Sequence, residues 1–224
     1  MKNILKVQLC FILLVLPLST LLAQSKFDLT NNQIEFRIQS ADEVVANATG
    51  TPFIHGQFAP ASVDEYKQQY MVRLNATNGV LEFKDASGQI LVISNEEDHV
   101  IRMQDGTERV YQTLSTTDGR VLVQRLWSDD TDNGLYVKES VEFHPAREAL
   151  NSYDVNKSAA YVRLDDVFYY KVEGQATLSE VPNRKKDFLK TFEKKAIKNY
   201  LKDENIDIKE REDLIKLFGF YFNN

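Results

Sequence analysis

The chain has 224 residues, a formal net charge of −6 and one cysteine. Its charge is unevenly divided, because residues 24–182 carry 14 basic and 25 acidic side chains whereas residues 183–224 carry 11 and 8. An acidic body repels phosphate backbones, which argues against sequence-independent binding of nucleic acid. We therefore expect no nucleic-acid partner.

The N-terminus has the parts of a secretory signal peptide over residues 1–23. Lys2 and Lys6 precede an apolar core at residues 9–22, and the small residue Ala23 follows it. A membrane span needs about 20 continuous apolar residues, and Pro17 interrupts this shorter core. We expect cleavage after Ala23, export to the periplasm or beyond, and no transmembrane span afterwards; the alternative is an uncleaved anchor. Cys10 lies inside the leader, so the mature chain would have no disulfide and no thiol nucleophile.

Apolar residues recur with a period of two after the leader. In "GVLEFK", Leu81 and Phe83 share one side and Glu82 and Lys84 the other, and "YVKESVEF" (residues 136–143) alternates in the same way. The segments "RVLVQRLW" (120–127) and "VFYYKV" (167–172) are apolar on both faces and predict central strands.

Turn dipeptides separate these segments. They are Asn78-Gly79, Ser87-Gly88, Asp105-Gly106, Asp118-Gly119 and Asn133-Gly134. We also expect a hairpin between residues 159–164 and 167–172 across Asp165-Asp166. A short helix over Val63 to Gln69 is a further expectation, because Ser62 and Glu65 fit a capping box.

The period changes to a helical one after Pro182. Asn183 is expected to cap a helix running to about Lys202, and Asp207 with Glu210 marks the start of a second helix. The sequence thus predicts an α+β, mainly β fold: an antiparallel meander of about eight to ten strands over residues 24–182, as a curved sheet, open sandwich or partial barrel. A C-terminal helical hairpin over residues 183–224 packs on the same domain.

Motifs for catalysis are weak. His55, His99 and His144 have no metal-ligand spacing, no G-x-S-x-G is present, and the many acidic residues identify no particular carboxylate pair. We therefore name no catalytic residue. Surface or structural roles are expected for the histidines.

The segment "SDDTDNG" (residues 128–134) is the candidate cation loop. Asp129, Asp130 and Asp132 offer oxygen ligands for calcium, although Ser140 stands where an EF-hand has its glutamate. A polar hairpin loop explains the same residues. Calcium is the only cofactor we consider.

Two aromatic residues in the central strands are candidate binding residues. Tyr169 and Trp127 could contact a sugar ring or a peptide, and core packing is the alternative for each.

From Thr51 onward the chain resembles a family of exported proteins of unknown function from Gram-negative bacteria. The resemblance lies in "YMVRLNATNGVLEFKD", "YDVNKSAAYVRLDDVFYYKVEG" and the closing "RKKDFLKTFEKKAIKNYLKDENIDIKEREDLIKLFGFYFN". Leu74 departs from it, since similar proteins have an aromatic residue there. The resemblance implies export, a meander and Lys-rich helices, and it implies no activity.

Three functions stay open at this point. The first is a non-catalytic exported module that binds an envelope or secreted protein. The second is a periplasmic hydrolase whose acidic residues converge in space, and the third is a carbohydrate or lipid binder that uses the concave face of the sheet.

Overall fold

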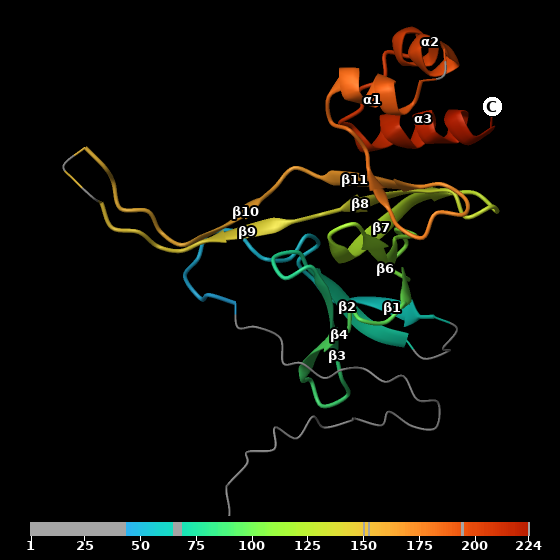
Figure 1. The fold of residues 1–224 in the computed structure, drawn as a ribbon. Helices are drawn as coiled ribbons and strands as arrows, with labels where there is room; N and C mark the ends of the chain where they lie inside the picture. Colours follow the sequence, from blue (N-terminus) through green and yellow to red (C-terminus); the bar gives the residue numbers. More distant parts are fainter. Residues whose placement is uncertain (1–43, 65–68, 150, 152, 194, 224) are drawn as a thin grey trace, which may run out of the picture.

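The computed structural model describes residues 44–64, 69–149, 151, 153–193 and 195–223, which form twelve strands and three helices (Figure 1). The strands are β1 (Ala59–Val63), β2 (Gln69–Asn75), β3 (Val80–Lys84), β4 (Ile90–Ile93), β5 (Val100–Met103), β6 (Val110–Thr116), β7 (Gly119–Ser128), β8 (Gly134–Lys138), β9 (Val141–His144), β10 (Ala160–Arg163), β11 (Val167–Lys171) and β12 (Ser179–Glu180). The helices are α1 (Lys185–Thr191), α2 (Lys195–Asp203) and α3 (Arg211–Asn223). The prediction of a mainly β fold with helices at its end is confirmed.

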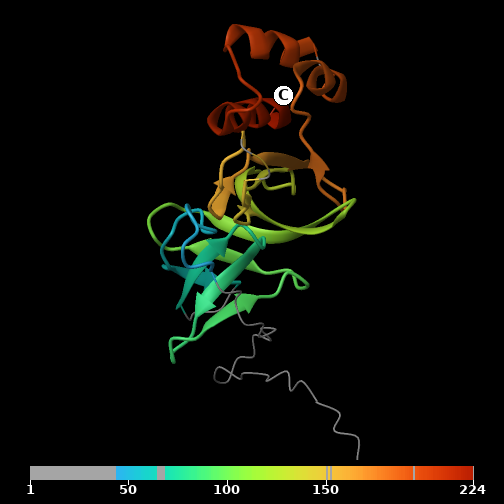
Figure 2. The ribbon, with the colours of Figure 1, turned by 90° about the vertical axis from the view of Figure 1, so that its left-hand side faces the viewer.

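Ten strands form one antiparallel sheet in the order β12-β11-β8-β7-β6-β5-β1-β2-β3-β4. The sheet curls into a half-barrel, and the helices lie beyond β11 and β8 (Figure 2). Where its parts approach each other, the Val141 amide donates to the Ala76 carbonyl at 3.2 Å, and Arg120 Nε donates to the Asn95 carbonyl at 2.8 Å. Of the shapes that the sequence left open, the structure is a curved sheet that forms a partial barrel.

β9 and β10 form a two-stranded arm that projects from the sheet (Figure 1). β9 follows β8 and β10 precedes β11, so the arm continues the β8–β11 pair outward, with the Leu164 amide donating to the Ser140 carbonyl at 3.0 Å. The predicted hairpin across Asp165-Asp166 is therefore wrong. The two aspartates form a corner within one strand path, and they do not reverse the chain.

All five predicted turn dipeptides lie where one strand gives way to the next, and Gly119 is the first residue of β7. Gly79, Gly88, Gly106 and Gly119 have positive φ. At the fifth, Asp132 takes the left-handed conformation with φ of 72°, and Gly134 begins β8. Aspartate is one of the few residues besides glycine that adopt this conformation.

The predicted helix over Val63 to Gln69 is also wrong. Val63 ends β1, Gln69 begins β2, and Ser62 pairs with Gln69 across the hairpin. Residues 65–68, which include the second half of the capping box, lie outside the described residues.

Two apolar clusters lie on one face of the sheet, because the register places their strand residues opposite one another on neighbouring strands. The first fills the curl and includes Val72, Phe83 and Ile101. The second joins the sheet to the helices, with Leu135 and Phe168 packed in the same cluster as residues of α1, α2 and α3. Sheet and helices therefore share a core.

A smaller cluster lies on the opposite face. The Leu178 amide donates to the Ser115 carbonyl at 2.8 Å, which draws the chain after β11 back across the sheet. Leu178 then packs in one cluster with Val123 and Tyr136, and Tyr169 lies against that cluster. The central strands are thus covered on both faces, as predicted from their composition.

The single helix predicted over residues 183–202 is two helices in the structure. The chain turns at Phe192, which caps α1 and is buried, with its ring 4.5 Å from that of Phe188 and 5.5 Å from that of Phe218. Burial of this ring outweighs helix continuity there. Arg184 is the N-cap of α1 and makes no side-chain cap bond, so the cap predicted at Asn183 is wrong.

The predicted leader, its cleavage after Ala23 and Cys10 lie outside the described residues. Among the residues that the structure describes, none of the helices is long and apolar enough to cross a membrane.

Candidate functional site

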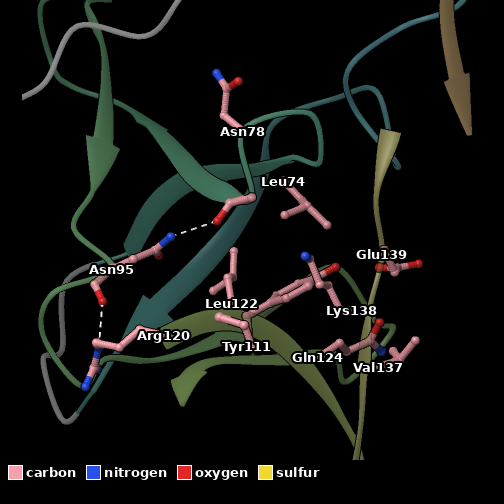
Figure 3. A pocket seen from close by; sticks show the side chains of 12 residues that line it. Leu74, Asn78, Asn95, Tyr111, Arg120, Leu122, Gln124, Val137, Lys138 and Glu139 are labelled. Carbon is pink, nitrogen blue, oxygen red and sulfur yellow. Dashed lines mark hydrogen bonds between the residues drawn. The ribbon is translucent and has the colours of Figure 1, made fainter. Parts of the chain in front are cut away.

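A cavity of about 150 Å³ lies where the turn after β2 approaches β7 and β8 (Figure 3). Its wall includes Asn78 from the β2–β3 turn, Asn95 from the segment after β4, and residues of β6, β7 and β8. Asn95 ties these parts together. Its side-chain amide donates to the Gly79 carbonyl at 2.8 Å, and its own carbonyl accepts from Arg120 at 2.8 Å.

Three buried polar atoms of the cavity wall have no hydrogen-bond partner in the described part of the chain. They are the hydroxyl of Tyr111, Oε1 of Gln124 and Oε2 of Glu139, in residues that are 2%, 8% and 7% exposed. The strand register brings them together, because Tyr111 pairs with Gln124, Gln124 pairs with Val137, and Glu139 follows two residues later. An unpaired buried polar group costs about 1–3 kcal/mol. Three in one wall indicate a site that a polar molecule completes.

The second oxygen of Glu139 belongs to an ion network. Arg163 and Arg211 each donate to Glu139 Oε1, at 3.2 and 3.1 Å, and both also bond Asp166. This network joins the end of β8 to the corner before β11 and to the first residue of α3. Its two guanidinium groups and two carboxylates balance in charge.

The surroundings of the cavity raise the pKa of the Tyr111 hydroxyl. Burial raises the pKa of this hydroxyl to about 12, and the Glu139 carboxylate adds to the increase. The Arg109 guanidinium opposes it, and this group lies near the hydroxyl without the geometry of a hydrogen bond. The hydroxyl is therefore protonated at neutral pH and is available as a hydrogen-bond donor.

The three candidate calcium ligands are not brought together. Asp129 Oδ1 accepts the amides of Thr131 and Asn133 at 2.9 and 3.0 Å, and Asp129 Oδ2 accepts the side-chain amide of Asn133 at 2.7 Å. Burial acts to raise the pKa of Asp129, and these hydrogen bonds, that of the Asn133 side chain first, lower it below its ordinary value. Asp132 instead forms an ion pair with Lys171. Within the described ranges, no three His, Cys, Asp or Glu side chains are placed so that they could hold a metal ion together, and this includes Asp130.

The two aromatic candidates lie on opposite faces of the sheet. Trp127 is stacked on Phe222 of α3, with ring centroids 5.4 Å apart and planes 8° from parallel. Tyr169 lies half-buried against the cluster that contains Leu178. Both residues contribute to packing, and they do not form a shared binding surface.

The three histidines have different surroundings. His99 is buried, and its Nδ1 lies 2.8 Å from Asp64 Oδ2. His144 is exposed and lies 3.4 Å from Glu142, while His55 is exposed in the segment before β1. These placements agree with the expected structural and surface roles.

Sequence alternation missed a buried ion pair on the other face of β2 and β3. Glu82, expected to point into solvent, is 1% exposed and accepts from Arg73 Nε at 2.8 Å and from Asn75 Nδ2 at 2.8 Å. Arg73 lies 3.6 Å from the ring centroid of Phe53 and 4.2 Å from that of Phe58. The segment before β1 thus covers a face that the pattern assigns to solvent.

The outer end of the β9–β10 ladder is braced by the start of the described chain. The Thr49 amide donates to the Ala159 carbonyl at 2.9 Å, and the Tyr161 amide donates back to the Thr49 carbonyl at 2.8 Å. Phe143 and Tyr161 pack across the two strands with centroids 4.9 Å apart. These contacts support the arm next to its tip.

The tip of the arm, residues 145–159, carries exposed apolar side chains. Tyr153 is fully exposed at 101% and Val155 is 68% exposed. A hydrogen-bonded pair between Arg147 and Asp154, 2.9 Å apart, and a bridge between Arg147 and Lys157 hold the strands of the tip together.

Comparisons of the chain with protein-family models, with curated proteins and with solved structures find no match.

Proposed function

We propose that this protein is an exported, non-catalytic module that binds a protein partner through the tip of its β9–β10 arm. The observation that carries the proposal is the full exposure of Tyr153 beside the exposed Val155 on a braced, projecting arm. Burying an aromatic and a β-branched side chain in a partner's pocket stabilises a complex by about 1.5–3 kcal/mol for each side chain. Tyrosine is enriched at such interfaces because it combines a large apolar ring with a polar end.

The charge of the tip indicates the kind of partner. Residues 145–159 contain two basic and two acidic side chains, so the tip is neutral although residues 24–182 are strongly acidic. Recognition would therefore depend on an apolar pocket for Tyr153, and binding would change little with salt. The natural counterpart is an envelope or secreted protein that offers such a pocket.

The carboxylate of the cavity wall supports a non-catalytic role. Glu139 lines the cavity, and it and Asp166 both accept hydrogen bonds from the same two arginines, Arg163 and Arg211. Carboxylates held by paired guanidinium groups are suited to joining structural elements. This arrangement favours the binding module over the hydrolase alternative.

Export is part of the proposal and rests on residues 1–23. Intact-mass measurement of the mature protein from a Gram-negative host tests it directly. A chain that begins at Gln24 supports export, and a chain that retains the apolar leader contradicts it.

Site-specific photocrosslinking tests the arm. With benzoylphenylalanine at position 153, we expect a discrete adduct in the exporting host, and a weaker adduct when Val155→Ser is added. The matched control carries the same group at Glu204, an exposed position between α2 and α3. Equal adducts at both positions, or none at position 153, would refute the proposal.

A further inference from the structure

The wall of the cavity beside β7 and β8 contains buried polar atoms that no other group in the described chain hydrogen-bonds. Hydrogen bonds within the sheet and the ion network use the surrounding groups, but Tyr111, Gln124 and Glu139 each leave one buried atom without a partner. Two of these atoms are acceptors, and the tyrosine hydroxyl can donate or accept. Figure 3 shows these side chains together with Asn95 and Arg120 around the cavity.

The charge around the cavity favours a neutral ligand. The charged side chains of the wall are Arg120, Lys138 and Glu139. Arg120 is paired with Asp98, and Glu139 is paired with Arg163 and Arg211, which also hold Asp166. An added cation would meet Arg120 and Lys138, and an added anion would meet the second oxygen of Glu139. Either ion would also lose its hydration in a confined site, which is costly without a compensating charge.

The polar groups also argue against an apolar ligand. A hydrocarbon would leave two acceptors and one hydroxyl desolvated and unpaired, which weakens binding relative to a molecule that bonds them. A cavity of about this size holds a molecule of about six non-hydrogen atoms, comparable to benzene. Hydroxyl groups on adjacent carbons supply both donors and acceptors within that size.

We infer that the cavity lined by Tyr111, Gln124 and Glu139 binds a small neutral polyol of about the size of glycerol. Its hydroxyls donate to Glu139 Oε2 and Gln124 Oε1 and exchange a hydrogen bond with the Tyr111 hydroxyl. This site goes beyond the arm-mediated function, and its residues lie outside the arm. Failure of one proposal therefore leaves the other unaffected.

The test is an NMR titration of the mature chain with glycerol, using amide signals near the cavity. We expect saturable shifts, and a loss of affinity of about tenfold in Gln124→Leu and in Tyr111→Phe, since each removes one hydrogen bond. Both substitutions delete an atom without a partner in the described chain, so they are expected to preserve the fold. Gln112→Leu, on β6 one residue from Tyr111 and on the other face, is the matched control and should bind as the unsubstituted chain does.

A size-matched alcohol with one hydroxyl, 1-pentanol, tests the chemistry. We expect it to bind more weakly than glycerol by at least about tenfold, because it leaves polar groups unpaired. Shifts that rise linearly with glycerol, equal affinity for 1-pentanol, or equal affinity in Gln124→Leu and Tyr111→Phe would each overturn the inference. In each of those cases the cavity does not recognise a polyol through these three groups.

Discussion

Removing the carboxylate of Glu82 tests whether β3 has a covered outer face. In Glu82→Leu a side chain of similar size replaces one that is 1% exposed, and Arg73 loses the acceptor of its Nε and Nη2 groups at 2.8 and 2.7 Å. Asn75 loses the acceptor of its side-chain amide at 2.8 Å. The substitution therefore leaves a partly buried cation and a buried amide without their partner.

The expected cost follows from these losses. Breaking a buried ion pair from one side costs about 3–5 kcal/mol, and the 16% exposure of the Arg73 side chain places this pair near the lower end. Replacing both partners, in Arg73→Met with Glu82→Leu, removes the unpaired charge and leaves only the Asn75 amide unsatisfied, at about 1–2 kcal/mol. The double variant should thus be more stable than Glu82→Leu alone.

Thermal unfolding followed by the fluorescence of Trp127, the single tryptophan, measures both variants. We expect a melting temperature about 6–15 °C lower for Glu82→Leu, because about 1 kcal/mol corresponds to about 2–4 °C at this chain length. A loss below about 1 kcal/mol for Glu82→Leu would mean that the carboxylate faces solvent, as the alternation predicts. A double variant that is less stable than the single one would refute the unpaired-charge argument.

Three further predictions concern single groups. Gly50→Ala places a Cβ 2.4 Å from the Tyr161 carbonyl oxygen at a φ of +77°, which should weaken the hydrogen bond from the Tyr161 amide to the Thr49 carbonyl. Hydrogen exchange of the Tyr161 backbone amide should therefore become faster. Gly106→Ala is the control, because Gly106 has a similar φ of +81° and open space around it. Between pH 10 and 12 Tyr111 should contribute a fall of about 2–3 kcal/mol in the unfolding free energy, because the unfolded chain loses the Tyr111 proton near 10 and the folded chain near 12. Tyr111→Phe should remove that share, while Tyr136 and Tyr169, whose pKa values burial also raises, keep theirs. Gly219→Ala in α3 should stabilise the fold by about 0.5–1 kcal/mol in urea unfolding, because alanine loses less backbone entropy than glycine in a helix. Its methyl would lie at an ordinary contact distance of 3.7 Å from Trp127 Nε1, and a destabilised variant would contradict this.

Local pattern predicts the strands but not what covers them. The alternation in β3 correctly identifies Leu81 and Phe83 as core residues, because that inference needs only the parity of successive side chains. The same parity assigns Glu82 to solvent. What buries it is Arg73 and the segment before β1, and contacts between segments distant along the chain do not appear in a pattern of period two.

Chain reversals are less predictable than strands. Asp165-Asp166 has the composition of a turn, yet β10 and β11 continue one path because each pairs with a segment of the β8–β9 path. The helix break at Phe192 has a similar origin. Helical periodicity continues through this residue, and the chain turns there because the ring is buried against α3.

The cavity is the hardest feature to predict, although one signal for it exists. Gln124 stands in the apolar run "RVLVQRLW", and a polar side chain at an inward position of a central strand must find a partner or form a site. Tyr111 and Glu139 complete the wall from β6 and from the residue after β8, and only the register across three strands places them beside Gln124. The sequence can thus indicate that an inward polar group exists. Its neighbours, and with them the chemistry of a ligand, follow from the pairing of strands that the sequence does not determine locally.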